Sequence, residues 1–447
     1  MQDVLNGKGT GESRLRAGTA RVNITPPVGA WLSGYDARTL PSQGVHDELY
    51  GKALVLADGQ TRLAILTADL IALSPETVAG IRRQVTRTTG IPGDNLLVSV
   101  SHTHAGPVTE RLEMIEEPDR GYMAELERRL AGVVYVANSR MQEATLGVGA
   151  GGANFNVNRR LVTPEGVVMR PNPQGTVDRR VGVIRVDGAD GEPIAVLMHY
   201  ACHATAWPSS NLLISADYPG AAQRLVEQVY GPGCTAMFLQ GCSGDIRPHL
   251  ADADGRFRGG TSREVVGLGR ILGAEVIKVC EQIETCGGPV AVRPREVDIP
   301  LQSPPARTEL VSLIDDLENR SDLDNDAKVD LIWARAVLSQ LQDGTAPTSV
   351  KAEVQAMRLG EGCLVALPGE VLVEIGLRIQ SLGRSPTFVV GLANGCIGYI
   401  PTAESLRQQG RNYEANFAYK AGLRPAPFAP EIEDVMVNTA VSLLASL

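Results

Sequence analysis

The sequence predicts an α/β protein with a mixed sheet and flanking helices. Short, strongly apolar segments such as 95–101 and 193–200 are typical of buried strands. Amphipathic segments with helical spacing, such as 74–89 and 217–230, alternate with them along the chain. Hydrophobic residues make up 43% of the 447 residues, which is enough for a sizeable core. We therefore expect a single α/β domain over residues 15–447.

Local patterns place most of the elements. We expect strands at 16–24, 51–56, 62–67, 95–101, 144–148, 181–186, 193–200, 234–239, 289–299, 351–359, 363–367 and 387–392. We expect helices at 74–89, 122–142, 217–230, 262–283 and 371–382. A charged helical pair, 308–317 and 326–341, is predicted as an insertion at about 306–344. The polar, Gly-rich residues 1–14 are expected to be a flexible lead-in.

Composition argues against several classes of partner. A net charge of −9 and an aromatic content of 4% do not suit a nucleic-acid-binding surface. No segment approaches the roughly 18–20 consecutive apolar residues of a membrane span, and the N-terminus lacks a signal-peptide pattern. The seven scattered cysteines contain no CxxC and are typical of reduced thiols. We expect a cytoplasmic protein with no nucleic-acid partner and no stable membrane association, and these features are compatible with a homo-oligomer.

Histidine is scarce and clustered, and this is the strongest functional signal. Four of the six histidines form two pairs, His102 with His104 and His199 with His203. On an extended segment residues i and i+2 share a face, so the first pair points the same way just after a buried strand. The second pair shares a face in a strand or in a helix. The pattern predicts a metal site, with the alternative that one member of each pair only orients its neighbour or fills the core.

Candidates for a further ligand are carboxylates at strand ends, because catalytic zinc usually has three protein ligands and one open position. Glu370, in Ala-Leu-Pro-Gly-Glu, directly follows a buried strand. The alternative is that it only stabilises the N-terminus of the helix predicted at 371–382. Residues 240–249 form a Gly-rich turn, but they contain no P-loop, and Ser243 is not in a Gly-x-Ser-x-Gly motif. Phosphate binding and a serine nucleophile are therefore not favoured.

In this order the motifs resemble the neutral/alkaline (non-lysosomal) ceramidase family. The resemblance runs from residue 17 to about residue 420. Its markers are segments 101–107 (Thr-His-Thr-His-Ser-Gly-Pro in the family), 156–159 (Asn-Ile-Asn-Arg), 201–205 (Ala-Val-His-x-Thr), 244–248 (Gly-Asp-Val-Ser-Pro), 368–370 (Pro-Gly-Glu) and 391–399 (Gly-Leu-x-Asn…Tyr). The resemblance implies the fold of the ceramidase catalytic domain. We expect no counterpart of the family's C-terminal β-sandwich domain.

The resemblance also implies a zinc-dependent amidase. Carried over by position, Zn²⁺ would be held by His102, His203, Glu370 and Tyr399. His199 would then be structural. A zinc-dependent amidohydrolase of this kind cleaves a linear C–N bond, other than a peptide bond, by attack of metal-bound water.

Three further residues would act on the amide. Arg159 and Tyr413 match family residues placed to bind the amide carbonyl, where they would stabilise a tetrahedral oxyanion. His104 is a neighbour of the metal and a candidate to protonate the leaving nitrogen.

One departure from the family bears on the substrate. Arg247 stands where the family has the serine of Gly-Asp-Val-Ser-Pro, and a guanidinium cannot act as a nucleophile. We take Arg247 and Asp245 as candidate substrate-binding residues, because an arginine there favours an anionic or polar group. The expected substrate is a small, soluble N-acyl compound. The alternatives are a ceramidase proper acting on N-acylsphingosine and a catalytically inactive, ligand-binding relative.

Overall fold

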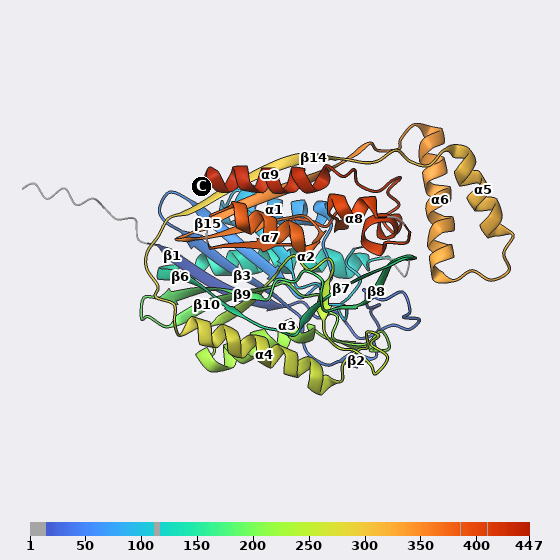
Figure 1. Cartoon of the computed structure of the whole chain (residues 1–447). Helices are drawn as coiled ribbons and strands as arrows, with labels where there is room; N and C mark the ends of the chain where they lie inside the picture. Colours follow the sequence, from blue (N-terminus) through green and yellow to red (C-terminus); the bar gives the residue numbers. More distant parts are fainter. Residues whose placement is uncertain (1–14, 111–116, 385, 409) are drawn as a thin grey trace, which may run out of the picture.

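Two larger β-sheets packed face to face, with helices on both outer faces, build most of the molecule (Figure 1). The computed structural model describes residues 15–110, 117–384, 386–408 and 410–447. The lead-in predicted at 1–14 lies outside these residues. The predicted α/β class with a mixed sheet is confirmed, because both larger sheets contain parallel and antiparallel pairs.

The first sheet has eight strands. From edge to edge they are β12 (Thr235–Gln240), β10 (Pro193–Tyr200), β9 (Arg180–Gly188), β6 (Gln142–Gly152), β1 (Arg16–Asn23), β3 (Tyr50–Ala57), β4 (Arg62–Ala68) and β5 (Leu96–Val100). The outermost pair at each edge is parallel, β10 with β12 and β4 with β5. The loops after β5, β10 and β12 carry three of the segments singled out from the sequence.

The second sheet has four strands, and shorter strands lie beside the two sheets. Its order is β14 (Val290–Pro300), β15 (Ser349–Leu359), β16 (Gly362–Ala366) and β18 (Thr387–Val390). The short strands are β2 (Gly44–Val45), β7 (Asn156–Thr163), β8 (Gly166–Asn172), β11 (Leu213–Ile214), β13 (Ile246–Pro248), β17 (Glu370–Val371) and β19 (Tyr399–Ile400). Of these, β13 pairs with β7, and β17 pairs with β19.

Strands that are apolar on both faces explain the layered packing. On β4, Ile65 packs between the two sheets, whereas Leu66 packs on the outer, helix-covered face. On β16, Leu364 faces the first sheet and Val365 faces the opposite side. Since successive side chains of a strand alternate between faces, a continuous apolar run indicates burial on both sides.

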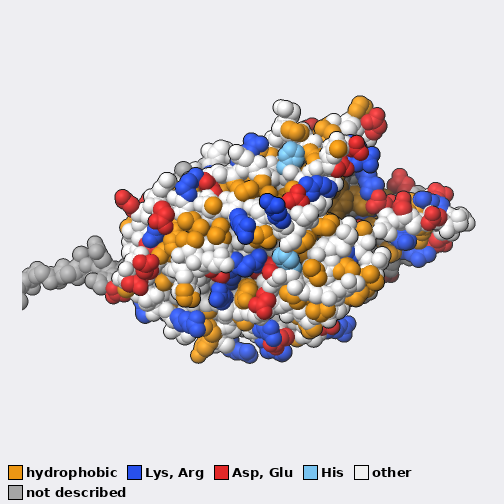
Figure 2. Space-filling view, turned by 90° about the horizontal axis from the view of Figure 1, so that it is seen from below, with side chains coloured by type: hydrophobic (Ala, Val, Ile, Leu, Met, Phe, Trp, Pro, Cys, Tyr) orange, Lys and Arg blue, Asp and Glu red, His pale blue; other side chains and the backbone are white. Residues whose placement is uncertain are grey.

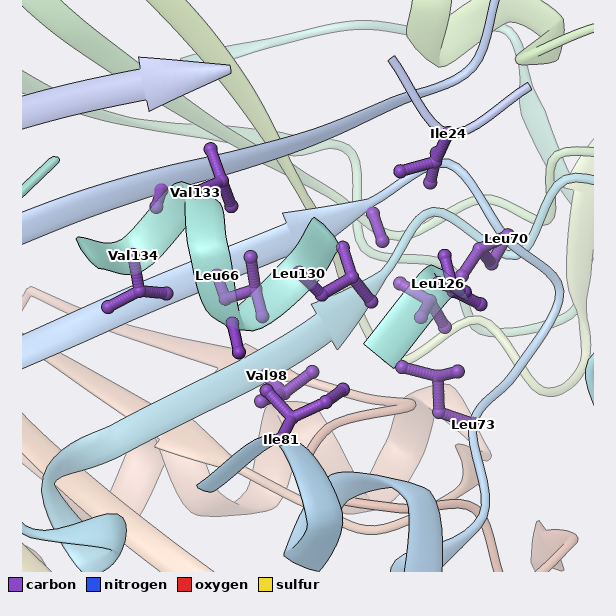
Figure 3. Close-up of a cluster of buried hydrophobic side chains, with 14 of the residues drawn as sticks. Ile24, Leu66, Leu70, Leu73, Ile81, Val98, Leu126, Leu130, Val133 and Val134 are labelled. Atoms are coloured by element: carbon purple, nitrogen blue, oxygen red, sulfur yellow. The ribbon is translucent and has the colours of Figure 1, made fainter. Parts of the chain in front are cut away.

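Helices cover the outer faces. They are α1 (Pro75–Thr89), α2 (Arg120–Ser139), α3 (Asp217–Tyr230), α4 (Ser262–Cys280), α7 (Val373–Leu382), α8 (Ala403–Arg407) and α9 (Ile432–Ala445). The first sheet is covered by α1 and α2 over one half and by α3 and α4 over the other, while α7 and α9 cover the second sheet. Figure 3 shows Leu130 of α2 and Ile81 of α1 beside Leu66 and Val98 of the sheet.

The helical pair predicted at about 306–344 is present as α5 (Arg307–Glu318) and α6 (Asn325–Asp343), between β14 and β15. The pair stands apart from the two sheets at one end of the molecule (Figure 1). On the face that carries α3 and α4, Figure 2 shows basic, acidic and apolar side chains intermixed. None of the described helices is both long enough and apolar enough to cross a bilayer.

Strand ends determine where the chemistry-bearing residues lie. His102 follows β5, His203 follows β10, and Arg247 follows β12. Glu370 follows β16 and Tyr399 follows β18, from the second sheet. The helix expected from residue 371 begins at Val373, because Glu370 and Val371 pair with β19 as a strand.

Candidate metal centre

Three histidine side chains converge although two chain segments supply them. His102, His104 and His203 form a group whose ligand nitrogens all lie within 4.8 Å of one another. The Nε2 atoms of His102 and His104 are 3.3 Å apart. His102 and His203 are buried and His104 is half-buried, so the group is more accessible on the side of His104.

His102 reaches this position through an unusual backbone conformation. Its φ is +60°, in the left-handed region that costs a residue other than glycine of order 1–3 kcal/mol. The expectation of a simple extended segment is therefore wrong at His102, because the chain turns directly after β5. Strain of this kind persists only where the surroundings stabilise it, and it is concentrated at functional sites.

Glu370 joins the histidines. Its Oε2 lies 3.0 Å from Nε2 of His203 and 3.2 Å from Nε2 of His102. The carboxylate is buried. Two ligand atoms on one tetrahedral zinc lie about 3.3 Å apart when each bond is about 2.0–2.1 Å long. The two separations from Glu370, 3.0 and 3.2 Å, therefore fit a common tetrahedral ion.

Backbone carbonyls fix the tautomers of the histidines. Nδ1 of His102 lies 2.7 Å from the carbonyl of Ile71, and Nδ1 of His104 lies 2.8 Å from that of Gly34. Nδ1 of His203 lies 2.5 Å from another backbone carbonyl. A carbonyl only accepts, so each Nδ1 donates and each neutral ring presents the lone pair of Nε2 to the centre. Lone pairs this close repel one another, and a cation between them removes that repulsion.

Burial and neighbouring charges determine the protonation states. Burial, with the charge of Arg159, lowers the pKa of His203 to about 4. Burial, with His102 and His203, holds the pKa of His104 well below its ordinary value. Burial raises the pKa of Glu370, but His102 and His203 outweigh it and hold that pKa well below the usual range. At neutral pH His104 and His203 are neutral and Glu370 is ionised, the forms that bind a metal.

Tyr399 is placed by a long-range strand pair. In the parallel pair β17–β19, Glu370 lies directly beside Tyr399. The two strands approach closely at Gly369, where a Cβ would lie 2.3 Å from the carbonyl oxygen of Gly398. The Tyr399 hydroxyl accepts a hydrogen bond of 2.9 Å from Arg159.

Arg159 and Tyr413 both lie next to Tyr399. Arg159 also donates to Glu414 at 2.9 Å, and Glu414 accepts from Arg160 at 2.7 Å. Tyr413 begins a π-helical turn, Tyr413–Phe417, a feature that is frequent at functional sites. Its ring centre lies 5.7 Å from that of Tyr399. Glu414 was not predicted, although its position directly after Tyr413 was a signal available in the sequence.

The two candidate substrate-binding residues differ in their surroundings. Asp245 is buried, and its two oxygens accept hydrogen bonds of 2.9 Å from the Val373 backbone and from Asn158. Arg247 is half-buried, with its guanidinium 4.3 Å from the ring centre of Phe257. A direct role for Asp245 in binding substrate stays a prediction, and its described contacts are with the scaffold.

His199 is separate from the centre. It is buried, and its Nε2 donates to the carbonyl of Val389 at 2.9 Å. Its ring packs 5.6 Å from that of Phe388. These contacts are those of a core histidine, the alternative that the sequence left open.

Comparison with known proteins places this geometry in a family. Residues 15–262, more than half of the chain, match the family described as neutral/alkaline non-lysosomal ceramidase, N-terminal. Neutral ceramidase B of Dictyostelium discoideum is 27% identical over 267 residues, covering 55% of this chain and 37% of that protein. Neutral ceramidase of Mycobacterium tuberculosis (strain ATCC 25618 / H37Rv) is 24% identical over 246 residues, covering 49% and 38%. The chain thus spans little more than a third of the length of these relatives.

The fold comparison agrees. The crystal structure of neutral ceramidase from Pseudomonas aeruginosa matches 97% of this chain and 75% of that chain, with a TM-score of 0.72 and 19% identity. At this identity the likeness shows a shared fold. The family match over more than half of the chain shows that this protein belongs to the neutral/alkaline non-lysosomal ceramidase family.

Proposed function

We propose that this protein is a zinc-dependent hydrolase that cleaves a linear amide bond in a small N-acyl compound. The convergence of His102, His203 and Glu370, with each histidine Nδ1 held by a carbonyl, is the observation that carries the proposal. Hydrolysis adds one water across the C–N bond and releases a carboxylic acid and an amine. Membership of a family whose named relatives are ceramidases supports this reaction class.

The donor set fits zinc better than a hard cation, because two or three imidazoles and one carboxylate are typical of zinc sites. Zinc bound there supplies Lewis-acid polarisation of a carbonyl and a water of lowered pKa. We propose His102, His203, Glu370 and Tyr399 as the residues that hold it. Burial of His203 and Glu370 excludes bulk water from one side of the centre.

Arg159 is suited to act on the amide carbonyl. Its guanidinium is buried and anchored to Glu414, and one of its nitrogens reaches the Tyr399 hydroxyl. A fixed donor of this kind stabilises negative charge on a carbonyl oxygen as the C–N bond breaks, and it needs no reorganisation. The Tyr413 ring lies beside that of Tyr399, and we propose its hydroxyl as a second donor to the carbonyl oxygen.

His104 is suited to transfer a proton. It is the more accessible of the three histidines, and its Nδ1 is held by Gly34. Glycine is required there, since a Cβ at residue 34 would lie 2.3 Å from His104 Nδ1. Neutral His104 presents the lone pair of Nε2, so it would first accept the proton that the attacking water releases. It would then pass that proton to the amide nitrogen, which is a poor leaving group unless it is protonated.

A ceramidase proper, acting on N-acylsphingosine, is the second candidate function. The names of the relatives favour it. Two observations count against it. The matches span little more than a third of those relatives, and Arg247 places a cation where the resemblance implies a serine. Assaying ceramide beside short N-acyl compounds distinguishes the two candidates.

Removal of the metal tests the proposal. Wild type is expected to contain about one zinc per chain, and a chelator is expected to abolish amide hydrolysis until zinc is restored. His102→Ala is expected to lose its zinc, and its kcat/KM is expected to fall at least about 100-fold. Even the hydrogen-bond partners of zinc ligands contribute about 10–100-fold to metal affinity or activity. Elemental analysis and an amide-hydrolysis assay measure both, with the exposed His249→Ala as the control. Turnover that the chelator does not affect would reject the mechanism, and zinc-free, inactive wild type would indicate a binding protein.

A pair of variants separates ligand from proton donor. His104→Gln is expected to keep about one zinc per chain while kcat falls about 10²–10⁴-fold, because a general acid is removed. Tyr399→Phe is expected to weaken zinc binding. Zinc content after dialysis against graded chelator, together with kcat, gives both quantities. Loss of zinc from His104→Gln would instead make His104 a ligand.

Acid is expected to destabilise the zinc-free protein through His203. Its folded pKa of about 4 lies below the ordinary 6.5, so its contribution to stability is present above about pH 6.5 and is lost as the pH falls towards 4. Between pH 7 and pH 5 the free energy of unfolding of wild type should fall by about 2 kcal/mol more than that of His203→Gln. Urea unfolding measures this, with His249→Gln as the control. Equal losses in wild type and His203→Gln would contradict the expectation.

A further inference from the structure

The Arg247 side chain has no direct ion-pair partner among the described residues. It also forms no hydrogen bond with the described part of the chain, and its Nε is buried without a partner. Its described contact is the ring of Phe257, 4.3 Å from the guanidinium carbon. Burial lowers the pKa of Arg247, which reflects the cost of holding this charge away from water. A half-buried guanidinium without an ion-pair partner is stabilised when an anionic group binds it.

Arg247 lies against the proposed centre. In β13 it follows Ile246, whose carbonyl oxygen lies 3.1 Å from Nδ1 of His203 and accepts from the His203 backbone at 2.9 Å. Arg159 lies close enough for its charge to act on the Arg247 guanidinium, and Tyr35 is also a near neighbour. The Tyr35 ring lies 5.2 Å from that of His104. Arg247 is therefore within reach of a molecule bound at the centre, on the Tyr35 side.

Charges of both signs lie around Arg247. Asp217 and Arg159 act on its guanidinium in opposite directions, and Arg159 and Arg160 share the carboxylate of Glu414. A divalent cation at the centre would add positive charge. Because the Arg247 side chain has no ion-pair partner among the described residues, its guanidinium favours an anionic ligand.

We propose that Arg247 determines specificity, and that its guanidinium binds a carboxylate of the substrate beside the scissile amide. This inference rests on the proposed function and narrows it to anionic N-acyl compounds. The planar guanidinium matches a planar carboxylate through two parallel hydrogen bonds, which a lysine cannot reproduce. A sulfonate or phosphate offers related chemistry and is one arm of the test.

Matched substrates test the proposal on zinc-loaded, full-length protein. N-hexanoylglycine is compared with N-hexanoylglycinamide, and succinyl-4-nitroanilide with butyryl-4-nitroanilide, so that the carboxylate lies on the amine side or on the acyl side. N-hexanoyltaurine supplies the sulfonate arm. Wild type is expected to favour the anionic member of at least one pair about tenfold or more in kcat/KM, the size of a charged hydrogen bond. Preference for the sulfonate over the carboxylate would overturn the assignment to a carboxylate.

Variants assign the preference to Arg247. In Arg247→Gln the anionic-to-neutral ratio of kcat/KM is expected to fall to within about twofold of unity, and Arg247→Lys is expected to be intermediate. Arg180→Gln is the matched control, because Arg180 also lies near an aromatic ring, 5.9 Å from the centre of Phe388, and should keep the wild-type ratio. A purely structural role would lower the melting temperature without changing the ratio. Equal rates for both members of each pair in wild type, or an unchanged preference in Arg247→Gln, would overturn the inference.

A binding measurement keeps this test distinct from that of the proposed function. Calorimetric titration of the zinc-loaded protein with succinate is expected to give an affinity at least about tenfold weaker in Arg247→Gln than in wild type. Equal affinities would overturn the role of Arg247 even if no amide is cleaved. Chelator-sensitive hydrolysis without any anionic preference would reject this inference and leave the proposed function standing. Carboxylate binding that depends on Arg247, without hydrolysis of any amide, would reject the proposed function and leave the role of Arg247 standing.

Discussion

The repulsion between the Glu370 carboxylate and the facing lone pairs of His102 and His203 is the interaction on which the rest of the site depends. Carbonyls at Ile71 and Ser243 hold the Nδ1 protons, so Oε2 of Glu370 meets the two Nε2 atoms at 3.2 and 3.0 Å without a proton between them. This arrangement is unfavourable in isolation and favourable around a cation. The backbone therefore prepares the site before any metal arrives, and the strained φ of +60° at His102 is part of its cost.

The two packed sheets make this preparation possible. Histidines come from loops that follow β5 and β10 of the first sheet, whereas Glu370 and Tyr399 follow β16 and β18 of the second. The rigid core between the sheets fixes the two halves relative to each other. The same construction leaves Arg247 beside the centre without an ion-pair partner among the described residues, so one scaffold positions both the proposed zinc ligands and the proposed anion-binding residue.

Local patterns predicted much of this molecule, and long-range pairing explains what they missed. The helix at 74–89 was predicted because its signals are local: Ser74 caps it and Gly90 ends it with a φ of 73°. The strands β7 and β8 were not predicted, because β7 carries polar residues such as Asn158 that are buried only through partners distant in the sequence. No local pattern shows that Glu370 lies beside Tyr399, or that the backbone turns at His102. The residue pattern made His102, His203 and Glu370 candidates, whereas Tyr399 and the complete ligand set were implied by the family resemblance.

Anomalous X-ray diffraction from crystals of the zinc-loaded protein, recorded on both sides of the zinc absorption edge, tests the central claim most directly. The account predicts one strong peak per chain, about 2.0–2.2 Å from Nε2 of His102, Nε2 of His203 and Oε2 of Glu370. Absence of a peak there, or a zinc ion bound elsewhere while these side chains keep their contacts of 3.0 and 3.2 Å, would contradict it.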